Sequence, residues 1–520
     1  MKRGLILFLG AALVMMMASD VLVQGQKAPE PAPAPAQPLV ERRVKDLGPL
    51  PIPAAPPLST GGISISPNGE RMGYTLIDRT RVIKQGKGLT PRYESCCVCD
   101  GRPGPFYYYA GGGPSFSPDS DAFYYLVRRR RGDVIKDSLV RNGIIGPEYH
   151  YILGALFSPD SKHFAYRVDY PSSTEAELNR SNMVLLDGMQ VFAGSETEEL
   201  VFSPDSQHLA FIATPVFRGK VCVILDGEIG PSYDGVLSEA PVFSPDSKQI
   251  AYWALHKGKR FVAVAELREG KWVVVHDWKD APTHDGRMQL PVFSPDSQHM
   301  AYVGVDGGKA SVWLDGKQQE ASYQGIAPPL FSPDSKRLAY VAIQGEEKFV
   351  VCDGKEGTHY DLVQYPFCVF SPDSKHLAYI GWRGAKGDPA KWRGARWFLV
   401  CDGMEGPPVA YTMREGPDEK APVFSPDSKH LAYFCERGRE QFIMCDGIAG
   451  PAHAIVRIPE KYCLVDGKAI TPGMDPAPPD KNGTLRYVVG DGKEAWLVEV
   501  DWPAGLDWRN GMMEIDKEKK

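Results

Sequence analysis

Carboxylate and imidazole side chains recur at fixed positions along this chain, and they are the first candidates for catalysis or metal binding. Eight aspartates stand in copies of the tripeptide Ser-Pro-Asp: Asp119, Asp160, Asp205, Asp246, Asp296, Asp334, Asp373 and Asp427. A histidine follows this turn in five copies, at His163, His208, His299, His376 and His430. A catalytic acid is needed once or twice in a chain, not in every repeat, and aspartate in a turn bonds to nearby backbone groups. We therefore interpret both sets as turn residues and expect no catalytic or metal site there.

The thiol groups give a weaker signal. The chain has ten cysteines, which is few for its 520 residues. Four of them precede an Asp-Gly pair: Cys99, Cys352, Cys401 and Cys445. A thiol in that place acts as a small apolar core group. Cys96 and Cys97 lie close to Cys99, but no second Cys-x-x-Cys pair completes a zinc site. We expect neither a metal nor a cofactor, and the sequence leaves any disulfide pairing open.

Motifs of several functional classes are missing. Prolyl-peptidase-type enzymes carry an α/β-hydrolase domain, but no Gly-x-Ser-x-Gly elbow occurs here. The Ser-x-Asp-x-Gly-x-x-Trp turn of sialidases is not matched, because the aromatic Tyr433 comes one residue too late after Ser425. No Gly-rich nucleotide loop is present. Fifty-nine Lys and Arg against 65 Asp and Glu give a net charge of −6, which excludes a wholesale polybasic nucleic-acid binder. We therefore predict a chain that is not an enzyme and does not bind nucleic acid.

These polar residues belong to a repeat that spans most of the chain. Phe-Ser-Pro-Asp-Ser begins at Phe116, Phe157, Phe202, Phe243, Phe293, Phe331, Phe370 and Phe424. The seven steps from the first to the last cover 308 residues, a mean period of 44. A weaker copy, Ile65-Ser-Pro-Asn-Gly69, precedes them and makes nine, and a degenerate tenth lies at 482–488. A fixed period of this length indicates a solenoid or a propeller.

One repeat shows which secondary structure is expected. Residues 421–424, 430–434, 441–445 and 452–456 read as short strands because they are rich in aliphatic and aromatic groups. Ser425-Pro-Asp-Ser428 and Asp446-Gly447 read as turns, since Pro presets one turn angle and Asp-Gly tolerates positive φ. Four short strands per repeat are typical of a propeller blade. The sequence thus predicts an all-β propeller of nine to ten four-stranded repeats, as one large ring or two smaller rings in tandem.

The unit Phe-Ser-Pro-Asp-Ser-Lys-x-Leu-Ala-Tyr resembles the WD-repeat-like propeller unit of the TolB family. The resemblance covers Ile63 to Trp502. It implies a propeller fold, with ligands on the face that carries the loops between the second and third strands of each blade. The chain departs from the family pattern because a Pro-rich linker stands where TolB-like proteins carry an amino-terminal domain.

The ends of the chain indicate export. Lys2 and Arg3 precede an apolar run over residues 4–18, which is too short to span a bilayer and is typical of a secretory signal. We assign residues 1–25 to a signal peptide, 26–58 to a Pro/Ala-rich linker, 59–505 to the propeller and 506–520 to a charged tail. We expect a periplasmic or extracellular protein with no transmembrane span in its mature chain. The alternative is an uncleaved membrane anchor extending to Val23, which Asp20 makes costly.

Antiparallel blades place their loops on two faces. The Ser-Pro-Asp and Asp-Gly turns share one face, and the loops between strands 2 and 3, several of them basic, share the other. The longest of these, residues 382–397, holds three Trp and five Lys or Arg, types that are enriched in binding hot spots. The candidate binding residues are Arg128, Arg129, Arg130, Arg131, Lys257, Lys259, Arg260, Trp382, Arg383, Lys386, Lys391, Trp392, Arg393, Arg396, Trp397, Arg437 and Arg439.

These observations favour a non-enzymatic protein-interaction scaffold. We expect its partner to be an envelope or extracellular protein, with anionic groups docking on the basic loop face. The alternative is a carbohydrate-active or small-ligand-binding propeller with a site in its central channel, formed by acids on the inner strands.

Overall fold

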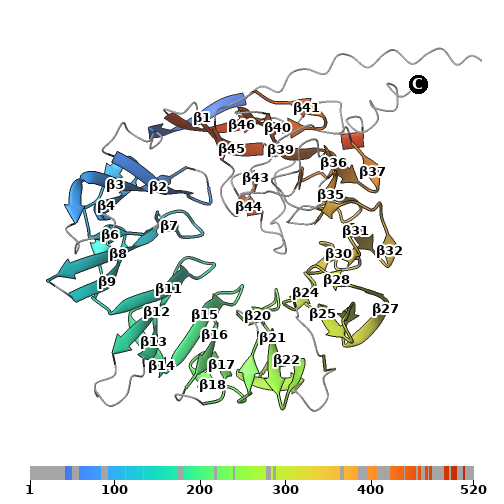
Figure 1. The fold of residues 1–520 in the computed structure, drawn as a ribbon, viewed down its shortest axis with the longest axis horizontal. Helices are drawn as coiled ribbons and strands as arrows, with labels where there is room; N and C mark the ends of the chain where they lie inside the picture. The colour runs from blue at the N-terminus through green and yellow to red at the C-terminus, as the bar shows by residue number, and fades with distance from the viewer. Residues whose placement is uncertain are drawn as a thin grey trace, which may run out of the picture. The chain divides into compact units, whose positions relative to one another are not determined.

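The computed structural model describes residues 41–49, 58–68, 70–83, 92–111, 113–132, 134–171, 180–215, 219–237, 240–276, 283–284, 289–363, 368–384, 396–406, 422–437, 440–451, 455–457, 463–465, 468–470, 485–490, 494–500 and 508–509. The chain divides into two compact units, Met1–Pro38 and Leu39–Lys520, and every described residue belongs to the second. Within these residues the strands form ten antiparallel sheets, and nine of the sheets have four or five strands. We number these nine sheets as blades 1 to 9 in chain order (Figure 1).

The first five blades contain the following strands. Blade 1 has β2 (Leu58–Ile65), β3 (Met72–Ile83), β4 (Arg92–Cys99) and β5 (Arg102–Pro103). Blade 2 has β6 (Tyr109–Ala110), β7 (Ser115–Phe116), β8 (Phe123–Arg131), β9 (Val134–Arg141) and β10 (Ile144–Ile145). Blade 3 has β11 (Tyr151–Phe157), β12 (Phe164–Pro171), β13 (Arg180–Leu186) and β14 (Met189–Gly194). Blade 4 has β15 (Glu196–Phe202), β16 (Leu209–Thr214), β17 (Cys222–Leu225) and β18 (Glu228–Ile229). Blade 5 has β19 (Gly235–Val236), β20 (Val242–Phe243), β21 (Gln249–His256), β22 (Lys259–Arg268) and β23 (Lys271–His276).

The other four blades repeat the arrangement. Blade 6 has β24 (Val292–Phe293), β25 (Met300–Asp306), β26 (Lys309–Leu314) and β27 (Lys317–Tyr323). Blade 7 has β28 (Gly325–Ile326), β29 (Leu330–Phe331), β30 (Leu338–Gln344), β31 (Glu347–Cys352) and β32 (Lys355–Glu356). Blade 8 has β33 (Leu362–Val363), β34 (Val369–Phe370), β35 (Leu377–Arg383), β36 (Arg396–Cys401) and β37 (Met404–Glu405). Blade 9 has β38 (Val423–Phe424), β39 (Leu431–Arg437), β40 (Glu440–Cys445) and β41 (Ile448–Ala449). The all-β propeller expected from the sequence is confirmed.

The tenth sheet joins the two ends of the array. It contains β1 (Glu41–Pro49), β42 (Ile455–Arg457), β43 (Cys463–Val465), β44 (Lys468–Ile470), β45 (Leu485–Gly490) and β46 (Glu494–Val500). Strand β1 runs antiparallel to β46, with Glu41 opposite Val500 and Pro49 opposite Glu494. One sheet therefore contains the first and the last strand, so backbone hydrogen bonds between the two ends hold the array closed.

The core lies between neighbouring blades. All six residues of β16 are buried, so this strand has apolar neighbours on both faces of its sheet. Phe211 packs with Val184 of blade 3, whereas the next residue, Ile212, packs with Phe261 of blade 5. Successive side chains of a strand point to opposite faces. A blade is therefore stabilised by both of its neighbours, which explains why the second strands read as nearly continuous apolar runs.

Two expectations about strand positions are wrong in detail. In the repeat that begins at residue 421, the fourth strand is β41, and Ile455–Arg457 instead pairs with β45 of the tenth sheet. Strand β1 lies inside the segment assigned to the linker, so the fold begins before Ser59. Local sequence does not reveal β1, because a polar strand flanked by prolines gains its partner from the far end of the chain. Within the part of the chain that the structure describes, no helix is long and apolar enough to cross a membrane.

Candidate functional site

The Ser-Pro-Asp-Ser turns act as joints between blades. In blade 4, the Ser203 hydroxyl donates to Asp205 Oδ1 at 2.5 Å and accepts from the His208 N–H at 2.9 Å. Ser206 has a φ of 66°, in the left-handed region. The Asp205 N–H donates to the Ser247 hydroxyl of blade 5 at 3.0 Å. The first serine and the aspartate thus stabilise their own turn, whereas the second serine accepts a hydrogen bond from the turn of the preceding blade.

The same bond recurs at every junction from blade 1 to blade 9. A backbone N–H in one turn donates to the second serine of the next turn at 2.9–3.0 Å, in the pairs Asn68–Ser120, Asp119–Ser161, Asp160–Ser206, Asp205–Ser247, Asp246–Ser297, Asp296–Ser335, Asp334–Ser374 and Asp373–Ser428. This unbroken series favours one continuous array over two rings in tandem. Hydrogen bonds from the Ser294 hydroxyl and the Gln298 N–H hold the pKa of Asp296 below its usual range. In each of the eight Ser-Pro-Asp turns, the aspartate carboxylate accepts a hydrogen bond from the first serine of the same turn.

The repeated histidines pair with the aspartates of the Asp-Gly turns. In blade 4, His208 Nδ1 lies 2.7 Å from Asp226 Oδ2, and the Leu209 N–H donates to Asp226 Oδ1 at 2.9 Å. Blades 3, 6, 8 and 9 contain the same pair at 2.6–2.8 Å. Arginine replaces the histidine in blades 1 and 7 and pairs with the equivalent aspartate. These bonds confirm that the two kinds of turn share a face.

Most of the described cysteine side chains are buried, whereas Cys352 and Cys368 are half-buried. The eight cysteines that can be assigned in the described residues are free thiols, including Cys96, Cys97 and Cys99. Burial raises the pKa of the Cys97 thiol to about 12 and that of Cys96 to about 11. A protonated, inaccessible thiol is a poor nucleophile. In the described part of the chain, no group of three or more His, Cys, Asp or Glu residues is placed to hold a metal ion.

The arginine run at the end of β8 is largely paired with local acids. Arg128 donates to Asp137 at 2.7 Å, and the carboxylate of Asp137 is fully buried. Arg129 and Arg131 both reach Glu148, at 2.5 and 3.3 Å. The remaining member, Arg130, is exposed and donates to the Gly132 carbonyl at 2.8 Å. Arg128 is therefore a structural residue, and Arg130 and Arg131 are the members that a partner can reach.

The basic residues of blade 5 flank the hairpin between β21 and β22. Lys257 and Lys259 are exposed, and Arg260 is half-buried. The Lys257 N–H donates to Asp234 at 2.5 Å, which ties this loop to the link that enters the blade. The loops between strands 2 and 3 thus lie beside the links between blades, as expected for the second face.

In blade 8, the two tryptophans of the predicted binding loop belong to the core. Trp382 and Trp397 stand opposite each other in β35 and β36 and are 5% and 0% exposed. Their inclusion among the exposed binding residues is wrong, because both strands extend further into the loop than the sequence indicates. Arg383 is exposed and donates to Glu405 at 2.8 Å, and Arg396 is exposed. Lys386, Lys391, Trp392, Arg393 and Arg439 lie outside the described residues, and Arg437 ends β39 opposite Glu440.

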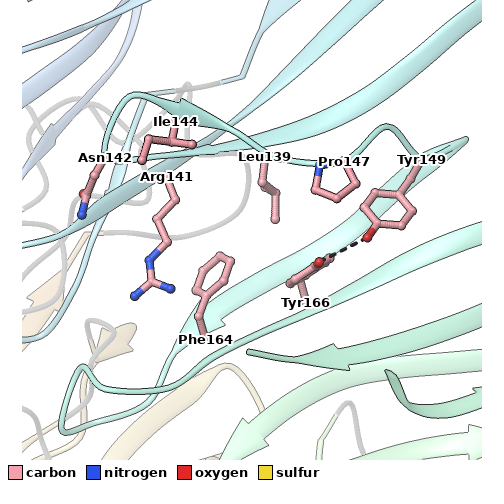
Figure 2. A pocket seen from close by; sticks show the side chains of 9 residues that line it. Leu139, Arg141, Asn142, Ile144, Pro147, Tyr149, Phe164 and Tyr166 are labelled. Carbon is pink, nitrogen blue, oxygen red and sulfur yellow. Dashed lines mark hydrogen bonds between the residues drawn. The ribbon is translucent and has the colours of Figure 1, made fainter. Parts of the chain in front are cut away.

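The sequence analysis missed a pocket between blades 2 and 3. Its volume is about 380 Å³. Figure 2 shows Arg141 and Phe164 toward one end, and Tyr149 and Tyr166 toward the other, with their hydroxyls 3.2 Å apart. One feature of the sequence could have indicated this pocket. Arg141 directly precedes an Asn-Gly turn, whereas Leu or Cys precedes the turn in the repeats that have Asp-Gly.

Comparison with known proteins identifies no family and gives only distant structural matches. No family model matches the chain, and no curated protein matches it. Among solved structures, a eukaryotic initiation factor matches with a TM-score of 0.40 and 13% identity, over 70% of this chain and 90% of that one. TolB from Acinetobacter baumannii matches with a TM-score of 0.26 and 13% identity, over 65% and 80%. The β-propeller domain of the Trilobed protease from Pyrococcus furiosus matches with a TM-score of 0.26 and 13% identity, over 57% and 97%. Matches this distant carry no inference about function, which must be argued from the chain's own residues.

Proposed function

We propose that this chain is an exported, non-enzymatic β-propeller that serves as a scaffold for protein binding. Its partner is an anionic protein of the envelope or the extracellular space, which docks on the loops between strands 2 and 3. The observation that carries the proposal is the use of the repeated polar groups as joints and caps. The Asp205 carboxylate, which could otherwise perform acid–base chemistry, accepts hydrogen bonds from the Ser203 hydroxyl and the Gln207 N–H and so fixes the turn that bonds to the next blade.

The second face carries exposed basic residues in three of its blades. Arg130, Arg131, Lys257, Lys259 and Arg396 are exposed in blades 2, 5 and 8. The corresponding hairpins of blades 6 and 7 instead carry acids, at Asp306 and Glu346. This uneven charge favours one orientation of a charged partner and speeds its association, and salt screens both effects.

The test is capture of partners from envelope extract on the tagged full chain, at low and at moderate salt. A triple variant, R131E/K259E/R396E, reverses three exposed cations of the second face. A matched triple variant, K248E/K336E/K429E, reverses three exposed lysines of the turn face. We expect a stoichiometric protein that is lost from the first variant, kept by the second and weakened by salt.

Equal capture by both variants would refute docking on the second face. If the tagged chain retained only glycan, or nothing, the scaffold proposal would be refuted. The alternative, a propeller with a ligand site in its central channel, would then be tested.

A further inference from the structure

Blade 2 departs from the repeat at a cross-strand pair that the other blades keep apolar. In those eight blades, an Ala or Gly of the second strand lies opposite a Leu, Val or Cys of the third: Gly73–Cys99, Ala165–Leu186, Ala210–Leu225, Ala251–Val264, Ala301–Leu314, Ala339–Cys352, Ala378–Cys401 and Ala432–Cys445. In blade 2, Tyr124 lies opposite Arg141. A small apolar pair is thus replaced by a large aromatic group and a cation.

The same blade also lacks the usual acid. The Asp of the Asp-Gly turn is Asn142 here, and its side-chain oxygen still accepts from the Phe123 N–H at 2.8 Å. Ala122 stands where five blades have histidine. Asn142 therefore keeps the backbone cap but brings no negative charge, so the usual counterion of this face is missing beside Arg141.

The guanidinium of Arg141 lies over two aromatic rings of blade 3. It is 5.2 Å from the ring centres of both Phe157 and Phe164. Arg71 and Arg337 also lie over phenylalanine rings of the next blade, but each bonds to an aspartate, at 3.0 and 2.9 Å. Within the part of the chain that the structure describes, the Arg141 guanidinium forms no ion pair with a carboxylate and no hydrogen bond. Of these three arginines, Arg141 is the one whose charge is left for a ligand.

The Arg141 side chain lines the pocket between blades 2 and 3 (Figure 2). Leu139, Ile144 and Pro147 form an apolar wall, and Phe164 and Tyr166 lie across from it. A volume of about 380 Å³ is near the lower end of the range for small-molecule sites, about 300–1,000 Å³. A mostly apolar cavity with few, well-separated polar groups is the usual composition of such a site.

We propose that this pocket binds a small organic anion that has a flat apolar body. A carboxylate or sulfonate pairs with the Arg141 guanidinium, in the place that an aspartate side chain takes on Arg71 and Arg337. The apolar body lies between the aliphatic wall and the aromatic rings, and the hydroxyls of Tyr149 and Tyr166 face its far end. Inorganic phosphate does not fit this site, because it would leave the apolar walls uncovered and its remaining charge unpaired.

The test is calorimetric titration of the full chain with 2-naphthoate and with its neutral analogue, 2-naphthalenemethanol. We expect one saturable site that binds the carboxylate about tenfold more tightly than the alcohol, since a charge-assisted hydrogen bond is roughly twice as strong as a neutral one. The variant R141Q should lose about tenfold in affinity for naphthoate and leave the alcohol unchanged. R141K keeps the charge but not the planar guanidinium, so it should retain only part of the affinity. R102Q, which removes an exposed arginine of blade 1 outside the pocket, should match the parent.

Three results would overturn the proposal. They are absence of saturable binding by the parent chain, equal affinity for the two naphthalenes, and unchanged naphthoate binding by R141Q. Misfolding of R141Q would not decide the matter by itself, so I144W provides a second variant. Ile144 is 76% exposed at the pocket wall, and a tryptophan there should hinder both ligands while the fold is kept. Undiminished binding by I144W would place the ligand elsewhere and overturn the proposal as well.

Discussion

The strongest structural prediction concerns the bond between the turns of blades 4 and 5. Ser247 is 2% exposed, and its hydroxyl accepts from the Asp205 N–H at 3.0 Å. The substitution Ser247→Ala removes the acceptor and leaves this amide without its partner. A donor left unsatisfied in a buried place costs about 1–3 kcal/mol, and the lower half of that range applies because Asp205 is an exposed residue.

A second substitution separates the bond from the backbone conformation. Ser247 has a φ of 62°, which glycine adopts at little cost. The substitution Ser247→Gly loses the same bond but relieves the left-handed strain, so it should cost about 0.5–1 kcal/mol less than Ser247→Ala. The exposed neighbour Lys248→Ala is the control for a change of side chain without a joint.

Hydrogen exchange at the Asp205 amide is the appropriate assay, because an array of repeats need not unfold in one cooperative step. A loss of about 1–2 kcal/mol corresponds to exchange that is roughly 5–30 times faster at this amide in Ser247→Ala. Exchange should be slower in Ser247→Gly than in Ser247→Ala, and unchanged in Lys248→Ala. Unchanged exchange in Ser247→Ala would refute the reasoning, because it would show that the bond across the junction contributes nothing to local stability.

Two other predictions follow from the pairs and the core. The hydrogen bond to Asp315 raises the pKa of His299 above its ordinary value of 6.5. Its stabilising contribution is therefore complete below pH 6.5 and is lost as the pH rises through the folded-state pKa. Thermal melts should show His299→Gln more destabilising at pH 5.5 than at pH 8.5, and an equal effect at both would contradict the pair. The substitution Trp397→Ala should lower the local stability of blade 8 by about 3–5 kcal/mol, measured by hydrogen exchange of its strand amides, because it empties a fully buried site. If Trp397→Ala left stability nearly unchanged but abolished partner binding, Trp397 would be a binding residue and not a core residue.

The blade could be predicted from sequence because its signals are local. Phe-Ser-Pro-Asp-Ser combines a core residue, a turn and a start for the next strand within five positions. The joint was not predictable in the same way, because the Asp205–Ser247 bond links residues 42 positions apart. The closing sheet is a still longer-range feature, since β1 and β46 lie at opposite ends of the described chain.

The candidate site failed where charge and burial depend on neighbouring strands. Counting cations suggested an open basic loop after β8, whereas the structure pairs Arg128 with the buried Asp137 across the hairpin. Counting tryptophans suggested hot spots, whereas the register of β35 and β36 places Trp382 and Trp397 in the core. Both errors have one cause: composition gives the number of charged and aromatic groups, but only strand pairing determines which of them reach the surface.

Residues that recur in every blade cannot distinguish one blade from another, so specificity must come from the departures. Blade 5 supplies Trp272, whose indole N–H donates to Asp226 of blade 4 at 3.2 Å and whose ring lies edge-on to His208. At His376 of blade 8 the same edge-on position is taken by Trp508, which comes from beyond the last sheet and whose backbone N–H donates to the Lys429 carbonyl at 3.0 Å. In both places a tryptophan covers a His–Asp pair and strengthens a junction. Blade 2 departs in the opposite sense, because its replacements bring in an arginine without an acid and leave a pocket beside it. The tryptophan departures add packing between blades. The departure in blade 2 instead leaves, among the described residues, an unpaired guanidinium beside an unfilled cavity, and a charged ligand needs both a counterion and a space to occupy.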